Sequence, residues 1–208
     1  MKAIRPYNDN SFNIIYNLLF CDDISLYYQQ NESADQYPWN VLFSSTATTK
    51  DLTQLVADLY LESRTRILAY KRLAAAGTSV KEKELLGVIV EVALEEGVDT
   101  LAAYKDGTAR YINQAEKLIV WDIVTTGSNK IIQQLFEVSA VVVSKIGAWE
   151  KDRLPQPQQG DARLSFLVNG DLYFGQGPFD VLQKDAMGGP VINSALALLQ
   201  FLTSQEMK

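Results

Sequence analysis

The spacing of apolar residues divides the chain into segments of two periods. Before residue 80 the apolar positions recur every three or four residues, which is the period of an amphipathic helix. Between residues 85 and 124 they alternate with other residues, which is the period of a β-strand. After residue 129 a helical segment, two short strand segments and a final helical segment follow one another.

The N-terminal segment predicts three helices. The first covers residues 11–29, with Ser11 as its cap. The second begins at Thr48 or Thr49, with Asp51 in the first turn, where the helix dipole favours a negative charge. The third ends at Gly77. Between the first two, residues 31–38 read as a loop and residues 39–43 as a strand or a buried turn.

The middle segment predicts an antiparallel meander over residues 85–124. Its strands are expected at residues 88–94, 98–104, 108–113 and 117–124. Every connection between them is short, and short connections force neighbouring strands to run antiparallel.

The C-terminal segment repeats the order of strands and helices. A helix over residues 129–149 has an apolar stripe that is expected to cover one face of the meander, which leaves the opposite face or an edge for function. Residues 150–161 contain two prolines and read as an exposed connection. Strands at 162–168 and 171–175, joined by an Asn169–Gly170 turn, precede a last helix that has Pro190 in its first turn.

These elements predict an α+β fold, with one antiparallel β-meander sheet packed by helices. We expect a single domain over residues 1–208. Its parts are a helical N-terminal part, residues 1–80, and a strand-helix-strand-helix part, residues 85–208.

The composition excludes several kinds of catalytic site. The chain has 208 residues, no histidine and one cysteine, Cys21. A Ser-His-Asp triad, a Cys-His dyad and a His-ligated zinc site are therefore impossible within it. Asp22 and Asp23 next to Cys21 would raise the pKa of its thiol, which favours a structural role. We expect no catalytic residues, no metal site and no cofactor.

The net charge of -6 argues against nucleic acid as a partner, since that binding depends on clusters of Lys and Arg. It also argues against an anionic membrane surface. We see neither a signal peptide nor 18 consecutive apolar residues, and we expect a cytoplasmic protein.

Three groups of polar residues have a functional and a structural interpretation. The carboxylates of the meander are candidates for an acid–base pair or a cation site, but their spacing selects no pair: they are Glu91, Asp99, Asp106 and Asp122. Asp106 fits its turn, and Glu91 fits an outward strand position. A glycine-rich run at residues 175–180 has Asp180 where a phosphate loop needs its third glycine, which favours a turn. The basic run Arg64, Arg66, Lys71 and Arg72 fits a solvated helix face.

Aromatic and polar residues on the third strand and around the glycine-rich run form the candidate interaction or ligand surface. On the third strand, Arg110 shares one face with Ile112, and Tyr111 shares the other with Asn113. The full set is Arg110, Tyr111, Asn113, Tyr173, Phe174, Gly175, Gly177 and Phe179.

Two segments, DTLAAYKDGTARYIN at residues 99–113 and NGDLYFGQGPF at residues 169–179, resemble a family of bacterial proteins of unknown function. The resemblance covers the C-terminal two thirds of the chain and implies no activity. The order of helices and strands is also similar in topology to roadblock and profilin-like domains.

Two hypotheses about function follow. The first is a non-catalytic protein-interaction module that self-associates as a homo-oligomer, because the edge strands of the meander can pair with a second copy. The alternative is a small-molecule-binding protein, or an enzyme that uses carboxylates or a bound cofactor.

Overall fold

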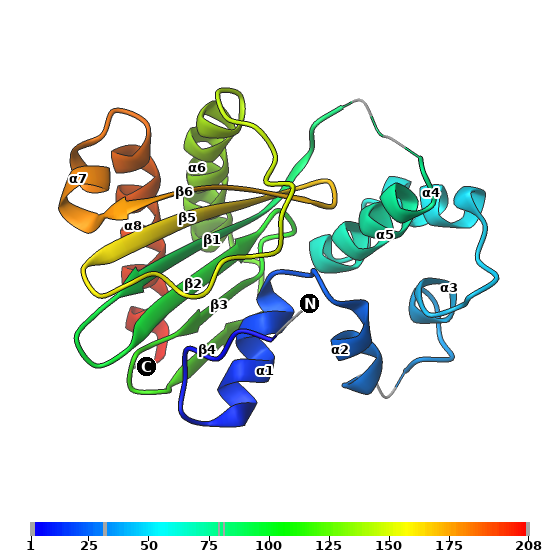
Figure 1. The fold of residues 1–208 in the computed structure, drawn as a ribbon, viewed down its shortest axis with the longest axis horizontal. Coiled ribbons are helices and arrows are strands. Elements are labelled where there is room, and N and C mark those ends of the chain that lie inside the picture. The colour runs from blue at the N-terminus through cyan, green and yellow to red at the C-terminus, as the bar shows by residue number, and fades with distance from the viewer. Residues whose placement is uncertain (1–2, 31–32, 79, 81, 207–208) are drawn as a thin grey trace.

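One antiparallel sheet of six strands forms the centre of the molecule. The computed structural model describes residues 3–30, 33–78, 80 and 82–206. The strands lie in the order β4-β3-β2-β1-β5-β6 (Figure 1). Their bounds are β1 Leu85–Ala93, β2 Val98–Tyr104, β3 Ala109–Ile112, β4 Leu118–Trp121, β5 Asp161–Val168 and β6 Asp171–Pro178.

Helices precede, interrupt and follow the strands in the described part of the chain. They are α1 Asn10–Leu19, α2 Ile24–Gln29, α3 Trp39–Leu42, α4 Thr49–Ala57, α5 Ser63–Ala75, α6 Thr126–Val143, α7 Phe179–Lys184 and α8 Gly188–Glu206. The predicted α+β fold with an antiparallel meander and N-terminal helices is therefore confirmed.

The meander joins the later strands through its first strand. β1 pairs with β2 on one side and with β5 on the other, both antiparallel. The strands after α6 thus extend the same sheet. The bounds of β2 agree with the prediction, while β3 and β4 are shorter than the alternation indicated.

The single helix predicted for residues 11–29 is wrong, because the chain forms two helices there. Cys21 adopts a left-handed backbone conformation with φ 52°, which ends the first helix. The side chain of Asp23 then accepts a hydrogen bond from the Ser25 amide and caps the second. Ser11 is not the cap of α1, since Asp9 is: its carboxylate accepts from the Ser11 amide.

The start of α4 and the end of α5 agree with the sequence prediction. Thr48 and Asp51 form a capping box at the start of α4. Gly77 follows α5 with φ +77°, a conformation that costs glycine nothing. Residues 39–42 form the short helix α3, so the strand interpretation of that run is wrong.

The long helix α6 starts and ends earlier than its apolar stripe suggested. Thr125 and Ser128 form a capping box, so the helix begins at Thr126, and it ends at Val143, which leaves Ile146 outside it. β6 also continues to Pro178, and α7, a helix that the sequence did not predict, begins at the next residue, Phe179.

Each face of the sheet packs on its own hydrophobic core. One core joins the inward residues of α6 and α8 to Val90, Leu101 and Phe166 of the strands. The other joins α1–α5 to Ile89, Ala102 and other strand residues that point the opposite way. Figure 1 shows α6 and α8 across one face, and the connection between α6 and β5 passing across the other. Of the two places that the sequence left for function, the opposite face is therefore covered, and the edges remain.

The β5–β6 turn is tied to α5 by close backbone contact. A Cβ atom added to Gly170 would lie 2.7 Å from the backbone nitrogen of Lys71, so no larger residue fits there. Asn169, next to it, accepts a hydrogen bond from the Glu84 amide with its side chain. The predicted turn thus also anchors the helical part to the sheet.

Candidate functional site

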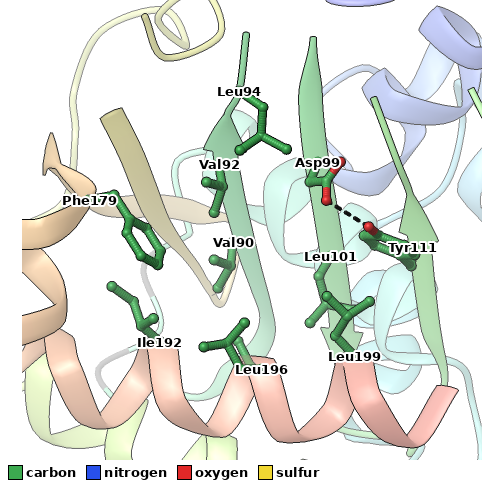
Figure 2. Close-up of a pocket in the computed structure, with 11 residues that line it drawn as sticks. Val90, Val92, Leu94, Asp99, Leu101, Tyr111, Phe179, Ile192, Leu196 and Leu199 are labelled. Atoms are coloured by element: carbon green, nitrogen blue, oxygen red, sulfur yellow. Dashed lines mark hydrogen bonds between the residues drawn. The ribbon is translucent and has the colours of Figure 1, made fainter. Parts of the chain in front are cut away.

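A narrow cleft lies between the sheet and helix α8. Val90, Val92 and Leu101 line it from the strands, and residues of α8 line it from the other side (Figure 2). Its volume is about 140 Å³. The remaining lining residues are Leu94, Asp99, Tyr111, Phe179, Ile192, Ala195, Leu196 and Leu199. The surface of the cleft is therefore almost wholly apolar.

The strand register explains how one polar pair enters this apolar site. Leu101 of β2 lies directly opposite Tyr111 of β3. Asp99 is two residues before Leu101, so its side chain lies on the same face and diagonal to Tyr111. The hydroxyl of Tyr111 donates a hydrogen bond of 2.7 Å to Oδ2 of Asp99 (Figure 2). The backbone amide of Gln114 donates to Oδ1 at 2.8 Å.

The tyrosine of this pair stays protonated. Burial raises the pKa of the Tyr111 hydroxyl, and the hydrogen bond to Asp99 and the negative charge of that carboxylate raise it further. Tyr111 is therefore a donor to Asp99. It is no candidate for a general base near neutral pH.

The opposite face of the sheet contains a group of buried charges. Glu91, which is fully buried, accepts a hydrogen bond of 2.6 Å from the Tyr16 hydroxyl. Nη1 of Arg163, on the neighbouring strand, lies 3.6 Å from its other carboxylate oxygen. Burial raises the pKa of Glu91, although the charges of Arg163 and Arg153 and the Tyr16 hydrogen bond oppose that shift. The prediction that Glu91 points outward is wrong.

Arg153 comes from the connection between α6 and β5. Its guanidinium lies 3.9 Å from the centre of the Phe20 ring and donates hydrogen bonds to Asn17 and Asp22. Arg153 is itself buried. The connection expected to be exposed therefore fastens helix α1 to the sheet, and these contacts favour a structural role for the charges.

The basic run of α5 is also structural. Arg66 is buried and pairs with Glu84 at 2.6 Å. Arg72 donates hydrogen bonds to the carbonyls of Val41, Leu42 and Ser44, which follow or belong to α3. The interpretation of this run as a solvated face is wrong for these two arginines, because both hold separate segments together.

Cys21 has the structural role that the sequence predicted. Its thiol is buried and lies 3.2 Å from the Tyr27 hydroxyl. Burial raises the pKa of the thiol to about 12, so it stays protonated and unreactive at neutral pH.

The two edges of the sheet differ in how they are covered. At β6, the backbone amide of Trp149 donates a hydrogen bond of 2.7 Å to the Leu172 carbonyl, and the Trp149 ring packs edge-on against Phe174. At β4, the four residues Leu-Ile-Val-Trp pair with β3 on one side, and no other strand of the described chain pairs with the second side. β4 is therefore the open edge.

Large apolar side chains are exposed at the end of this open edge. Val120 is 50% exposed, and Ile123 and Val124, which follow the strand, are 69% and 53% exposed. Ser63 and Asp106 exchange two hydrogen bonds that tie the start of α5 to the β2–β3 turn, and Leu59, just before α5, lies beside Lys105 and Phe136 of α6. Leu59 follows Leu52 and Leu55 at helical spacing, which predicts a place in the core, but α4 ends at Ala57 and Leu59 is 75% exposed, so that prediction is wrong.

The structure places the predicted surface residues in several environments. Tyr111 and Phe179 line the cleft together, on opposite sides of it (Figure 2). Tyr173 is buried in the same core, whereas Arg110 is buried on the other face and pairs with Asp122 at 2.6 Å. The rest lie apart: Asn113 in the β3–β4 turn, and Phe174, Gly175 and Gly177 on β6.

Sequence reasoning missed most of the cleft. It considered Asp99 only as one of several carboxylates. The inward stripe of the last helix, which includes Leu196, predicts a place in the core for residues that line the cleft. Glu91 carried a usable signal, since it is a single charge in an otherwise apolar strand. Partners such as Arg153 carried none, because they lie 62 residues or more along the chain, at a distance that spacing does not encode.

Comparisons with family models, curated proteins and solved structures find no match to this chain. Among the described helices, none is long and apolar enough to cross a membrane. In the same residues, no group of three Cys, Asp or Glu side chains is placed to hold a metal ion.

Proposed function

We propose that this protein is a non-catalytic interaction module that self-associates through β4. The observation that carries the proposal is the contrast between the two edges: Trp149 hydrogen-bonds to the outer side of β6 at Leu172, whereas no backbone group of the described chain hydrogen-bonds to the outer side of β4. An open edge presents unpaired amides and carbonyls that a second strand can pair with. Natural edge strands are usually protected by a charge or a proline, but β4 contains neither.

A second copy of the chain is the partner that fits this edge. Two β4 strands related by a two-fold axis run antiparallel, so the same surface serves on both subunits. Directly paired residues of antiparallel strands point to the same face of the sheet. An axis through Ile119 therefore sets Leu118 opposite Val120 of the partner subunit, which places apolar side chains together.

The small area that two β4 edges can bury indicates weak association of the two copies. A four-residue strand with Ile123 and Val124 beside it supports a small interface, of the class below about 1,200 Å² in which association is weak and reversible. We expect dissociation constants in the micromolar range or weaker. Self-association of this kind makes the oligomeric state depend on protein concentration.

The distribution of titratable groups supports a non-catalytic role. Several groups whose pKa is raised by burial, such as Tyr16, Tyr27 and Tyr104, are hydrogen-bonded within the α1–α5 face. Active sites instead gather perturbed groups in an accessible cleft. In this chain the cleft holds Asp99 and one protonated tyrosine.

Sedimentation velocity over about 1 µM to 1 mM tests the proposal, since this range resolves weak association. The variant Val120→Lys places a charge on the open edge and is expected to weaken association at least about tenfold. Val141→Lys is the matched control, because Val141 is 54% exposed on α6, away from the edge. A monomer at all concentrations, or equal effects of the two variants, would overturn the proposal.

The second candidate function is small-molecule binding in the cleft below α8. The specific observation in its favour is a preformed apolar site with one convergent polar pair, the usual composition of a ligand site. This candidate is compatible with self-association, because the cleft and the β4 edge involve different residues.

A further inference from the structure

The cleft has a polar end of one chemical kind. Asp99 accepts hydrogen bonds from the Tyr111 hydroxyl and the Gln114 amide, one on each carboxylate oxygen. A carboxylate has about four positions at which it accepts hydrogen bonds, so roughly two remain. The single hydroxyl proton of Tyr111 is already donated to Asp99. The pair therefore offers hydrogen-bond acceptors to a ligand and no donor.

The charge of Asp99 is not balanced by a neighbouring cation. The ion pairs of the described residues involve Glu62, Glu84, Glu91, Asp22 and Asp122 as acids, and none of them involves Asp99. Asp99 is also partly buried at the wall of an apolar cleft. A carboxylate in such surroundings is stabilised by a nearby positive charge, more strongly than in water because the local dielectric constant is lower.

The remainder of the cleft sets the size and shape of a ligand. An apolar cavity of roughly 150 Å³ accommodates a benzene ring, and this cleft has about 140 Å³. The aliphatic walls of this space are Val90 and Leu101 on the sheet and Ile192 and Leu199 on α8 (Figure 2). Phe179 supplies an aromatic wall on the side away from Asp99.

We infer that the cleft binds a small organic cation: a compact apolar body with one protonated amine that contacts Asp99. The inference rests on the second candidate function and is independent of self-association through β4. The body occupies the space between β1, β2 and α8, and the ammonium group donates hydrogen bonds to the free positions of Asp99. Hydrophobic contact and charge act at opposite ends of the same ligand.

Three probes of nearly equal shape separate these contributions. Benzylamine has the ring and the positive charge, benzyl alcohol has the ring and a neutral donor, and benzoate has the ring and a negative charge. Binding is measured by two-dimensional NMR of the ¹⁵N-labelled protein, which also reports which amides move. We expect benzylamine to bind at least about tenfold more tightly than benzyl alcohol, a difference of one decade in Kd. We expect no binding of benzoate.

Two variants and one control locate the site. Asp99→Asn keeps the shape of the side chain and removes its charge, so benzylamine binding is expected to weaken at least about tenfold while benzyl alcohol binding is nearly unchanged. Ala195→Leu places a larger side chain inside the cleft and is expected to abolish binding of both. Asp171→Asn, at an exposed carboxylate on β6, is the matched control and is expected to leave both unchanged.

The amide spectrum of each variant verifies that it folds before the titration is interpreted. The inference is overturned if benzylamine moves no amide of β1, β2 or α8, if benzyl alcohol binds as tightly as benzylamine, or if Asp99→Asn binds benzylamine as well as the unaltered chain does. Sedimentation tests self-association through β4, and the NMR titrations test ligand binding in the cleft. Either proposal can therefore fail while the other stands.

Discussion

The two faces of the sheet are packed with different chemistry, although the same strands form both. The face beneath α1–α5 contains hydrogen-bonded tyrosines and the buried charges Glu91, Arg153 and Arg163. The face beneath α6 and α8 is mainly aliphatic. Among the described residues, its buried hydroxyl groups belong to Ser128, Ser139 and Ser194 on the helices and to Tyr111 and Tyr173 on the strands.

The two faces therefore differ in how strictly their contacts fix the positions of the packed side chains. On the charged face, several partners must be in place at once: Arg153, for example, contacts Asn17, Asp22 and Phe20. On the aliphatic face, contacts are non-directional, and the polar groups at the cleft beneath α8, Asp99 and Tyr111, are hydrogen-bonded to each other. The adaptable face is therefore the one with room for a ligand.

The largest expected effect comes from neighbouring residues of β5 that point to opposite faces. Arg163→Met leaves Glu91 buried without its nearest positive charge and is expected to lower the free energy of unfolding by about 3–5 kcal/mol. Leu164→Met, on the aliphatic face, is the matched change and should cost less than about 1.5 kcal/mol. Urea unfolding measures both, and equal losses would contradict the distinction between the faces.

A second pair of variants tests where the molecule has free space. Ala195→Leu fills the cleft and is expected to raise the free energy of unfolding by about 0.5–2 kcal/mol. Ala102→Leu, at a fully buried position on the charged face, should instead overpack the core and lower it by about 1–3 kcal/mol. Thermal or urea unfolding gives the sign of each change. A loss at both positions would show that the cleft is not available to a side chain.

Helix capping should not distinguish the two faces. Thr48 begins α4 and Thr125 begins α6, each with a complete capping box. We expect Thr48→Ala and Thr125→Ala each to lower the free energy of unfolding by about 1 kcal/mol. If urea unfolding shows a much larger loss for one of them, then helix ends also contribute to the difference between the faces.

The pH dependence of stability is the subtlest test, since it appears as a slope. Burial raises the pKa of Glu91, so the folded chain keeps this proton at a pH where the unfolded chain has lost it. The stabilising contribution of Glu91 is therefore complete below its usual pKa and is lost as the pH rises through the raised value. Glu91→Gln should remove this slope when urea unfolding is repeated across that range of pH.

Glu84 is expected to give a pH dependence of stability that is opposite in sign to that of Glu91. Burial alone would raise its pKa, but the hydrogen bond from Lys105 and the charges of Arg66 and Lys105 hold it below its usual range. Its contribution is present above the usual pKa and is lost as the pH falls through the lowered value. Glu84→Gln should therefore destabilise the chain more at neutral than at acid pH, and parallel profiles for the two variants would contradict these assignments.

The sequence by itself determined the elements whose signals are local. The alternation at Val88, Val90 and Val92, the Asp106–Gly107 and Asn169–Gly170 turns, and the cap at Thr48 each depend on residues a few positions apart. Periodicity and turn chemistry are properties of short segments, so they are readable without the fold. For the same reason the zero histidine count restricted the possible chemistry at once.

Only the tertiary structure decided which residues meet across the sheet. Whether Glu91 points into a core or outward depends on what α1 and residues 144–160 place over it, and both are distant in the chain. The cleft likewise requires β1–β3 and α8 to be brought together, although Asp99 and Ala195 are 96 residues apart. Packing between distant segments is set by the whole core rather than by local spacing, so the site emerged only from the fold.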